Sequence, residues 1–338
     1  MLRGAVIGLG NIAMRGHFPA YLGDEALRSV TQIVAVMDIS EGNRAHVGKI
    51  LPAARFYSDI HALLENEELD FVDICSPPTT HLEYIRACSS KNIHVICEKP
   101  LTENLPTSTD VVNAVANSSI VFVPCHQYKY SPLWKCIFEK LQARDIGRAT
   151  LAQFNVFRLQ ADTGTGAWNP SWRINKQQSG GGILVDTGAH YFYLAQYFFG
   201  MPVKVSAILR NLKHQEYGVE DTAVCTLEYD RMLMQVNLTW AAAQRANSVS
   251  IVGTEGSLLY DGSKLLLSNA NGTRDIPMPD VSDKQQYVQW YVSLFKEFVR
   301  RVGAKDYSHD LLNEAFQVTK LLDLCYQSSA EQTVLPCR

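Results

Sequence analysis

The sequence predicts an α/β protein, with an N-terminal doubly wound parallel sheet and a C-terminal α+β domain built on a large, mostly antiparallel, open sheet. The chain has 338 residues, more than one compact core usually holds. Up to Pro124, short apolar runs alternate with helical stretches, which is typical of strands joined by crossover helices. Beyond Pro124, long β-rich segments joined by tight turns indicate an antiparallel sheet. We therefore expect one domain at 1–124 and a second at 125–338.

The first strand ends in a glycine turn. The apolar run Ala5-Val6-Ile7 is followed by Gly8-x-Gly10-x-x-Ala13 and then by an apolar-periodic segment. Gly8 permits a sharp turn, Gly10 has no Cβ to keep a pyrophosphate from the backbone, and Ala13 allows close helix packing. We expect the phosphates of a dinucleotide at the start of this helix, at Asn11 and Ile12, where N–H groups and the helix dipole favour negative charge.

An acidic residue ends the second strand, 32–37. Asp38 stands where a carboxylate accepts hydrogen bonds from the adenosine ribose hydroxyls. Because an aspartate would repel a 2′-phosphate, the sequence predicts NAD as the cofactor and disfavours NADP. A glycine turn in an α/β protein without a nucleotide is the alternative interpretation.

Further strands are expected at 55–57, 71–75, 94–97 and 120–123, giving six in all. Ligands bind at the carboxyl ends of such strands. There the stiff loop Ser76-Pro77-Pro78 is suited to line a cofactor, and His81 is either a contact or simply the first residue of a helix. Lys99 follows another strand at this edge, and Pro100 restricts its backbone to an extended geometry. On position alone a solvated lysine is as plausible as a catalytic one.

The second domain begins with a helix over 132–142 and continues with β segments at 149–159, 203–212, 222–229, 232–240, 248–252, 257–260 and 265–267. Two amphipathic helices close the chain. An open sheet with this many apolar residues has a face to cover. We therefore expect self-association through the sheet, as a dimer or tetramer.

Composition narrows the class of protein. The net charge is −3 with scattered lysines and arginines, so we expect no nucleic-acid partner. No uncharged apolar run is long enough to span a membrane, and because Met1 leads directly into the first strand we expect no targeting segment. The eight cysteines form no C-x-x-C pair and resemble the reduced thiols of a cytoplasmic protein.

The stretch 180–199 is apolar nearly all round, which predicts a buried helix. Its strongly ionisable residues are Asp186 and His190, which an α-helix places one turn apart on the same face. Since burying both groups is costly unless they serve each other or a ligand, the pair is a catalytic candidate. Alternatively, Asp186 charges the helix start and His190 is a core histidine. The spacing indicates no third metal ligand, so we expect no metal.

Taken in order, the motifs G-x-G-x-x-A, Asp38, S-P-P-T-T-H, E-K-P-L-T, W-R and G-G-G-x-x-x-D-x-G-x-H resemble the glucose-fructose oxidoreductase/inositol dehydrogenase family, abbreviated Gfo/Idh/MocA. The resemblance covers essentially the whole chain. It implies a Rossmann domain and NAD(P)-dependent oxidation or reduction of a sugar, nucleotide sugar or cyclitol. It also implies that Lys99, Asp186 and His190 are the catalytic residues.

The same resemblance implies cofactor contacts from Glu98, Lys99, Gln127, Trp172 and Arg173. Substrate contacts are expected from Lys99, Tyr128, Trp168, Arg173, Asp186 and His190. Many relatives carry an aspartate three residues after the histidine, where this chain has Tyr193. The glycine-rich segment 162–170 is expected to be a loop that could cover the site.

The expected chemistry is hydride transfer with proton transfer by His190 or Lys99, which the sequence does not distinguish. Two other functions are compatible with the same cofactor residues. One is a regulator that binds NAD(P) without catalysis, and the other is an NAD-dependent glycoside-processing enzyme.

Overall fold

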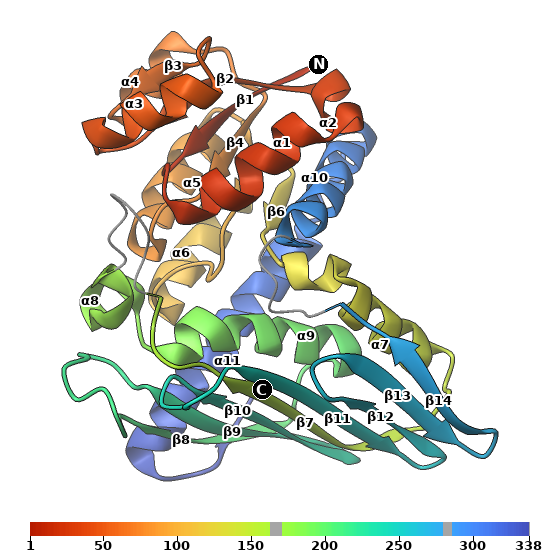
Figure 1. The fold of residues 1–338 in the computed structure, drawn as a ribbon. Coiled ribbons are helices and arrows are strands. Elements are labelled where there is room, and N and C mark those ends of the chain that lie inside the picture. The colour runs from red at the N-terminus through yellow and green to blue at the C-terminus, as the bar shows by residue number, and fades with distance from the viewer. Residues whose placement is uncertain (163–170, 280–285, 338) are drawn as a thin grey trace. The chain divides into compact units, whose positions relative to one another are not determined.

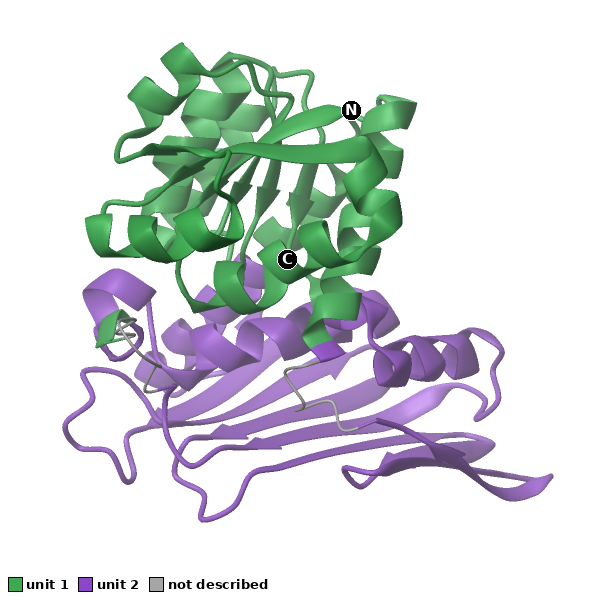
Figure 2. Ribbon diagram, turned by 45° about the horizontal axis from the view of Figure 1, so that its top comes forward, with its two compact units in different colours: residues 1–127, 164–172, 287–316 green, residues 128–163, 173–286, 317–338 purple. Residues whose placement is uncertain are grey.

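The computed structural model describes residues 1–162, 171–279 and 286–337, in two compact units (Figure 2). Unit 1 comprises residues 1–127, 164–172 and 287–316, and unit 2 comprises 128–163, 173–286 and 317–338. The sequence predicts a single division after residue 124, whereas in the structure a segment near the C-terminus packs with unit 1.

Unit 1 contains the predicted doubly wound sheet. Its six strands are all parallel and lie in the order β3-β2-β1-β4-β5-β6. The bounds are β1 (Leu2–Ile7), β2 (Thr31–Met37), β3 (Arg55–Tyr57), β4 (Phe71–Ile74), β5 (His94–Cys97) and β6 (Phe122–Pro124). Because helices cover both faces, the central strands are buried apolar runs.

The helices of unit 1 begin where the sequence offers caps. Asp24, Asp59 and Asn104 each accept a backbone N–H at a helix start. The bounds are α1 (Phe18–Gly23), α2 (Glu25–Val30), α3 (Glu41–Ile50), α4 (Ile60–Asn66), α5 (His81–Ser90), α6 (Leu105–Val115) and α10 (Tyr287–Ala304). A final helix, α11 (Asp310–Glu331), belongs to unit 1 up to Phe316 and to unit 2 beyond it.

Unit 2 contains the predicted open sheet, with nine strands in the order β14-β13-β12-β11-β7-β10-β9-β8-β15. Among the described strand pairs of this second sheet, β7–β10 is the only parallel one. The bounds are β7 (Ala149–Phe157), β8 (Lys204–Arg210), β9 (Thr222–Tyr229), β10 (Met232–Thr239), β11 (Ala246–Gly253), β12 (Gly256–Tyr260), β13 (Lys264–Asn269), β14 (Gly272–Pro277) and β15 (Leu335–Pro336). The two edge strands, β14 and β15, are additions to the predicted set.

One face of this sheet packs against α7 (Pro132–Gln142) and α9 (Ala189–Phe199), which lie above the strands in Figure 1. A shorter helix, α8 (Lys176–Ser179), precedes α9. Strand residues alternate between buried and accessible positions, as in a sheet with one covered face. On the accessible face, Leu233, Leu151 and Val252 lie side by side on β10, β7 and β11 and are 50 %, 47 % and 38 % exposed. This face therefore carries aliphatic side chains that contact solvent.

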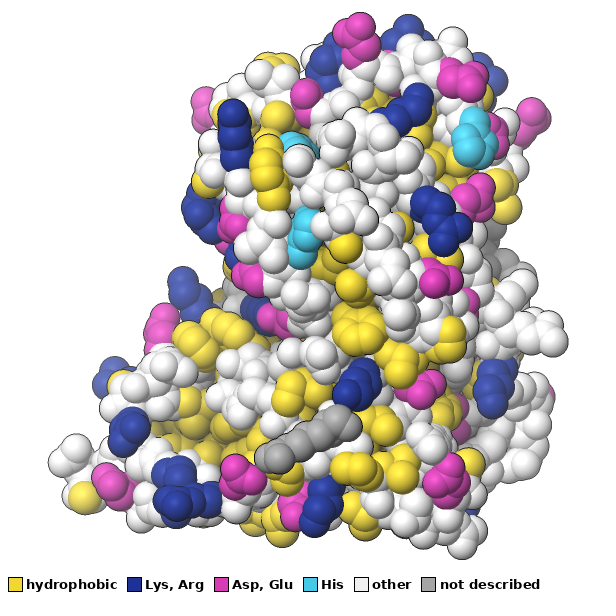
Figure 3. Space-filling view, turned by 180° about the vertical axis from the view of Figure 1, so that it is seen from behind, with side chains coloured by type: hydrophobic (Ala, Val, Ile, Leu, Met, Phe, Trp, Pro, Cys, Tyr) yellow, Lys and Arg dark blue, Asp and Glu magenta, His cyan; other side chains and the backbone are white. Residues whose placement is uncertain are grey.

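None of the helices in the described ranges is long and apolar enough to cross a membrane. The face seen in Figure 3 carries lysine and arginine side chains scattered among acidic ones, without one large basic patch. All eight cysteines are free thiols. 

Candidate active site

The glycine turn after β1 is a close approach of two strand ends. Gly8 has φ +85°, and a Cβ placed there would lie 2.6 Å from the backbone nitrogen of Ser76. Its own N–H donates to the carbonyl of Met37 at 2.8 Å. Glycine is therefore required at this position both by conformation and by space.

The helix after this turn begins with unpaired N–H groups. Its first backbone hydrogen bond runs from Met14 N–H to Gly10 O at 3.1 Å, so the N–H groups of Asn11 and Ile12 precede the hydrogen-bonded ladder. The segment then widens into a π-turn, η1 (Ala13–His17), where the sequence predicts a regular helix. N–H groups at a helix start favour the binding of an anion.

Asp38 follows β2 and braces the glycine turn. Its Oδ2 accepts the backbone N–H of Leu9 at 2.7 Å and Nδ2 of Asn43 at 3.0 Å, and its Oδ1 accepts the N–H of Ser40 at 2.7 Å. These bonds fix the carboxylate beside the turn, where the sequence predicts ribose recognition.

The loop after β4 is stabilised by hydrogen bonds of its own side chains and of His81. Ser76 Oγ bonds Thr80 Oγ1 at 2.7 Å, and Pro78 opens a short 3₁₀ turn, η2 (Pro78–Thr80), after Pro77. The ring of His81 is fully buried between the carbonyl oxygens of Leu101 and Ser76, at 3.0 Å and 2.9 Å. Burial lowers the pKa of His81. His81 therefore supports the loop from within the core.

Lys99 follows β5 at the same edge, and its peptide bond to Pro100 is cis. The backbone N–H of Lys99 donates to Oε2 of Glu98 at 3.0 Å, and the Glu98 side chain is buried. Gln127, after β6, is 2 % exposed and donates through Nε2 to the Tyr291 hydroxyl at 3.1 Å. Within the described residues, its Oε1 is buried and has no hydrogen-bond partner. That oxygen is an acceptor aimed at no protein group.

In unit 2 the buried helix forms as predicted over most of its length, but its start is a second π-turn, η5 (Leu184–Gly188), continued by α9. Its N-terminus is capped by a residue from the segment that precedes β9. Glu220 accepts the N–H of Gly182 at 3.0 Å, the N–H of Leu184 at 3.1 Å and the Tyr326 hydroxyl at 2.7 Å. Asp186 lies in the π-turn and His190 in α9, whereas the sequence predicts one regular helix for both.

Asp186 and His190 each have a defined neighbour. Asp186 Oδ1 accepts a hydrogen bond from Nη1 of Arg173. The His190 ring, 7 % exposed, stacks on Tyr128 at 4.1 Å between centroids and 7° between planes. Its Nδ1 lies 3.0 Å from the hydroxyl of Tyr193. The histidine ring thus stacks on one tyrosine and lies within hydrogen-bond distance of the hydroxyl of another.

Trp172 and Arg173 share a 3₁₀ turn, η4 (Ser171–Ile174). Trp168 and most of the predicted loop 162–170 lie outside the described residues.

Comparison with known families decides the class of protein. A family model described as an oxidoreductase family with an NAD-binding Rossmann fold matches residues 2–125, and one described as the GFO/IDH/MocA C-terminal domain matches residues 136–259. The chain belongs to the Gfo/Idh/MocA family. It is an oxidoreductase with an NAD-binding Rossmann domain.

Individual Gfo/Idh/MocA relatives are distant. The chain is 25 % identical over 282 residues to myo-inositol 2-dehydrogenase of Thermotoga maritima, covering 81 % of this chain and 80 % of that one. It is 22 % identical over 354 residues to D-glucoside 3-dehydrogenase of Escherichia coli, covering 98 % and 96 %. A levoglucosan dehydrogenase solved with NADH and levoglucosan superposes with a TM-score of 0.86 at 18 % identity, covering 99 % of both chains.

The residues present fit a nicotinamide dinucleotide. A Cβ at Gly8 would collide with the backbone of Ser76, so the turn stays narrow. The N–H groups of Asn11 and Ile12 are available to phosphate oxygens. Gln127 Oε1 is a buried acceptor without a hydrogen-bond donor among the described residues. These features lie on the carboxyl side of the parallel sheet, where doubly wound folds bind ligands.

Three supporting residues were not identified from the sequence: His17, Tyr291 and Glu220. His17 bonds Asp73 and Glu98, which stand 56 and 81 residues away, and Glu220 caps a helix 36 residues earlier in the chain. The sequence signal for His17 is its position four residues after the glycine-turn motif, because a helix that starts at the motif would place this histidine against the sheet.

Proposed function

We propose that this protein transfers a hydride between NAD and a hydroxyl-bearing or keto carbon of a sugar, nucleotide sugar or cyclitol. One combination of features supports this best. The Asp38 carboxylate is fixed beside the glycine turn, where it could bind the ribose, and His190 is buried and oriented by Tyr193. The relatives named for inositol, glucoside and levoglucosan oxidation favour a polyhydroxylated ring as substrate.

We propose that the cofactor is held by the groups that surround the strand ends of unit 1. Asn11 and Ile12 would bind the pyrophosphate, Asp38 the ribose hydroxyls, and Gln127 Oε1 the carboxamide N–H of the nicotinamide. Ser76, Pro77 and Pro78 would line the pocket, with His81 fixing their backbone. When bound, NAD supplies the hydride chemistry, and the protein manages the accompanying proton.

The proton and the developing charge on the substrate oxygen are assigned to three side chains. His190 accepts the hydroxyl proton in oxidation and returns it in reduction, because an imidazole titrates near neutral pH. Lys99 donates a hydrogen bond to the same oxygen and stabilises its negative charge. Asp186, which accepts hydrogen bonds from Arg173 and Thr187, accepts a further one from a neighbouring substrate hydroxyl.

We expect the substrate ring to contact Tyr128, Trp168, Trp172 and Arg173. Aromatic faces beside charged donors suit a ring with an apolar face and a hydroxylated rim.

Incubation with NAD⁺ and a panel of sugars, nucleotide sugars and cyclitols tests the proposal through NADH absorbance. Accumulation of NADH with one class of substrate is the expected result. A regulator would bind NADH without turning over any member of the panel. A glycoside-processing enzyme would cleave glycosides in an NAD⁺-dependent reaction without accumulating NADH.

We also propose that the protein self-associates through the accessible face of its nine-stranded sheet, where Leu233, Leu151 and Val252 form an aliphatic row. The free state of all eight cysteines suits work in the reducing cytoplasm.

A further inference from the structure

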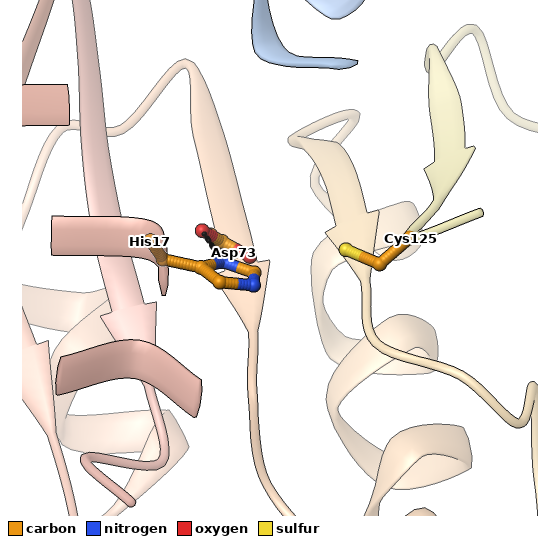
Figure 4. Close-up of side chains that lie close together, drawn as sticks. All are labelled: His17, Asp73 and Cys125. Atoms are coloured by element: carbon orange, nitrogen blue, oxygen red, sulfur yellow. Dashed lines mark hydrogen bonds and ion pairs between the residues drawn. The ribbon is translucent and has the colours of Figure 1, made fainter. Parts of the chain in front are cut away.

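Directly behind Lys99, unit 1 contains a buried group of ionisable side chains that the proposed reaction does not use. His17, on η1, is fully buried beside Asp73 of β4, which is also fully buried (Figure 4). Nδ1 of His17 lies 2.7 Å from Oδ2 of Asp73, and Nε2 lies 3.2 Å from Oε1 of Glu98. Carboxylates on both ring nitrogens require both nitrogens to carry hydrogen, so the ring is an imidazolium.

Aromatic hydroxyls complete the group. Tyr21 of α1 donates to Asp73 Oδ2 at 3.1 Å, and Tyr291 of α10 donates to Glu98 Oε1 at 2.5 Å. The ring of Tyr291 packs on His17 with centroids 4.3 Å apart. The hydrogen bonds therefore link the glycine-turn helix, two strand ends and α10 into one buried network.

The contacts between the side chains of this network determine which of them carry a charge. Burial lowers the pKa of His17, but the Asp73 carboxylate outweighs it and leaves that pKa well above its ordinary value. Burial raises the pKa of Glu98, but the hydrogen bond and charge of His17, together with the charge of Lys99, lower it on balance. Two carboxylates and one imidazolium leave a single negative charge.

The other titratable groups around His17 and Glu98 carry no compensating charge. They are Cys75 after β4, Cys97 of β5, Cys125 after β6, Tyr21 and Tyr291, whose pKa values burial raises, and His81 of α5, whose pKa burial lowers. Lys99, whose backbone N–H binds Glu98 Oε2 at 3.0 Å, is the cation that faces this charge.

We propose that the chain of hydrogen bonds Asp73–His17–Glu98 is a positioning device for Lys99. It fixes the backbone of Lys99 through Glu98 and sets a negative charge close to this lysine, so that Lys99 acts as the hydrogen-bond donor and His190 as the proton acceptor. His17 is a positioning residue, because it acts through Glu98. This inference rests on the proposed function and gives a structural reason for its assignment of the proton to His190.

The same atoms are not a metal site in this account. The donor atoms of His17, Asp73 and Cys125 all lie within 4.8 Å of one another, with the thiol facing the ring in Figure 4. However, both ring nitrogens are already engaged by carboxylates, and a metal would have to displace one of these bonds.

The test compares His17→Asn with a matched control, His94→Asn, in the full-length protein. His94 stands at the start of β5, packs against Phe298 of the same helix α10, and accepts the N–H of Val121 at 3.1 Å, a bond that an asparagine oxygen can replace. His17→Asn is expected to lower kcat by about tenfold or more, since misplacing a reacting group by about 1 Å lowers rates by about 10²-fold. The NADH affinity of both variants should equal that of the wild type, and so should the kcat of His94→Asn.

Two further readouts separate positioning from mere structural support. Without the imidazolium, Glu98 takes up a proton more readily, so the acid limb of the kcat profile should move to higher pH in His17→Asn and not in His94→Asn. A crystal structure of His17→Asn should show the Lys99 N–H no longer bonded to Glu98 Oε2. If His17→Asn is too unstable to assay, Asp73→Asn, which removes the counter-charge of His17 while keeping its volume, should give the same kinetic and structural changes.

A stability measurement does not require substrate. Because the pKa of His17 is raised on folding, its stabilisation is complete below 6.5 and fades as the pH rises through the folded value. Because the pKa of Glu98 is lowered, its stabilisation is present above 4.5 and is lost at lower pH. Wild type should therefore exceed His17→Asn in stability by the widest margin between pH 4.5 and 6.5.

Wild-type kcat and pH profile in His17→Asn would overturn the inference, as would equal losses in His94→Asn or stoichiometric metal in the purified protein. If wild type turns over no substrate, the proposed function fails. The stability margin and the position of Lys99 in the crystal then still decide whether the network behaves as described.

Discussion

The hydroxyl of Tyr193 lies 3.0 Å from Nδ1 of His190, and the same oxygen accepts the backbone N–H of Tyr128 at 3.1 Å. The ring of Tyr128 in turn stacks on His190. A single phenol therefore contacts both the His190 imidazole and the backbone of the residue whose ring stacks on it. In this chain a neutral side chain fills the position that many Gfo/Idh/MocA relatives give to an aspartate.

Replacing Tyr193 tests that relationship. Tyr193→Phe leaves the Tyr128 N–H unpaired in the core, and we expect a stability loss of about 1–3 kcal/mol and a several-fold lower kcat. Tyr193→Asp places a negative charge beside the imidazole and should move the acid limb of the kcat profile to higher pH, because a nearby carboxylate favours the charged ring. A Tyr193→Phe enzyme with wild-type kcat, measured alongside its denaturant unfolding, would show that the phenol has no orienting role.

His190→Ala and Lys99→Ala should each lower turnover by roughly 10²-fold or more, the usual size of acid–base contributions. NADH binding, followed by cofactor fluorescence, should be retained in His190→Ala because that residue manages the substrate proton. Normal turnover in either variant would remove its side chain from the mechanism.

Asp38→Ser should weaken NAD binding by roughly 10- to 100-fold, because hydrogen bonds to a charged group contribute about 1.5–3 kcal/mol. NADP, which the carboxylate repels, should lose less affinity or gain some. Asp59→Ser is the matched control, since Asp59 only caps α4 and serine is also a good cap. Calorimetric titration with both nucleotides measures the ratio, and an unchanged ratio in Asp38→Ser would contradict ribose recognition by Asp38.

Glu220 offers a pH test of the helix that carries His190. Burial raises its pKa above the ordinary 4.5, outweighing the hydrogen bonds from Tyr326 and the backbone. The folded state then binds the proton more tightly than the unfolded one, so this residue's contribution to stability falls as the pH rises from 4.5 through the folded pKa. Glu220→Gln should lack that fall, while Glu220→Ala should lose about 2 kcal/mol by leaving buried donors unpaired.

Chemical unfolding at several pH values measures both effects. The control is Glu216→Gln, whose parent side chain is 66 % exposed. Identical pH profiles for wild type and Glu220→Gln would show that Glu220 is not the titrating group.

Self-association is tested by placing a charge in the aliphatic row. Leu233→Lys should raise the concentration needed for assembly by tenfold or more, because a buried lysine at the centre of an apolar interface is strongly unfavourable. Leu212→Lys, at an exposed leucine beyond the end of β8, is the control. Light scattering across a concentration series gives the mass, and a monomeric wild type at every concentration would exclude this interface.

The sequence predicts the two sheets well because their strands are apolar runs at regular spacing. It misses β14, an exposed polar edge strand without that pattern. It also misses both π-turns, whose glycines are set by distant contacts. A Cβ on Gly16 would lie 2.8 Å from the Tyr291 ring, and one on Gly188 would lie 2.9 Å from Leu238. Local periodicity carries no information about such packing.

In the candidate site, too, local sequence pattern identifies some residues and misses those that act through distant contacts. Asp38, Lys99 and His190 stand out because their residue types are unusual beside apolar segments. Their supports do not, because His17 and Glu220 act on partners far away in the chain. Asp186 bonds Arg173, which stands on a separate turn, so this contact is apparent only in the structure.

The most direct test of the central claim uses a substrate from the polyol panel deuterated at its carbinol carbon. The account predicts that the NADH formed carries one deuterium, delivered from that carbon, and that His190→Ala slows its formation without loss of bound cofactor. NAD⁺ binding with no deuterated NADH from any sugar, nucleotide sugar or cyclitol would contradict it.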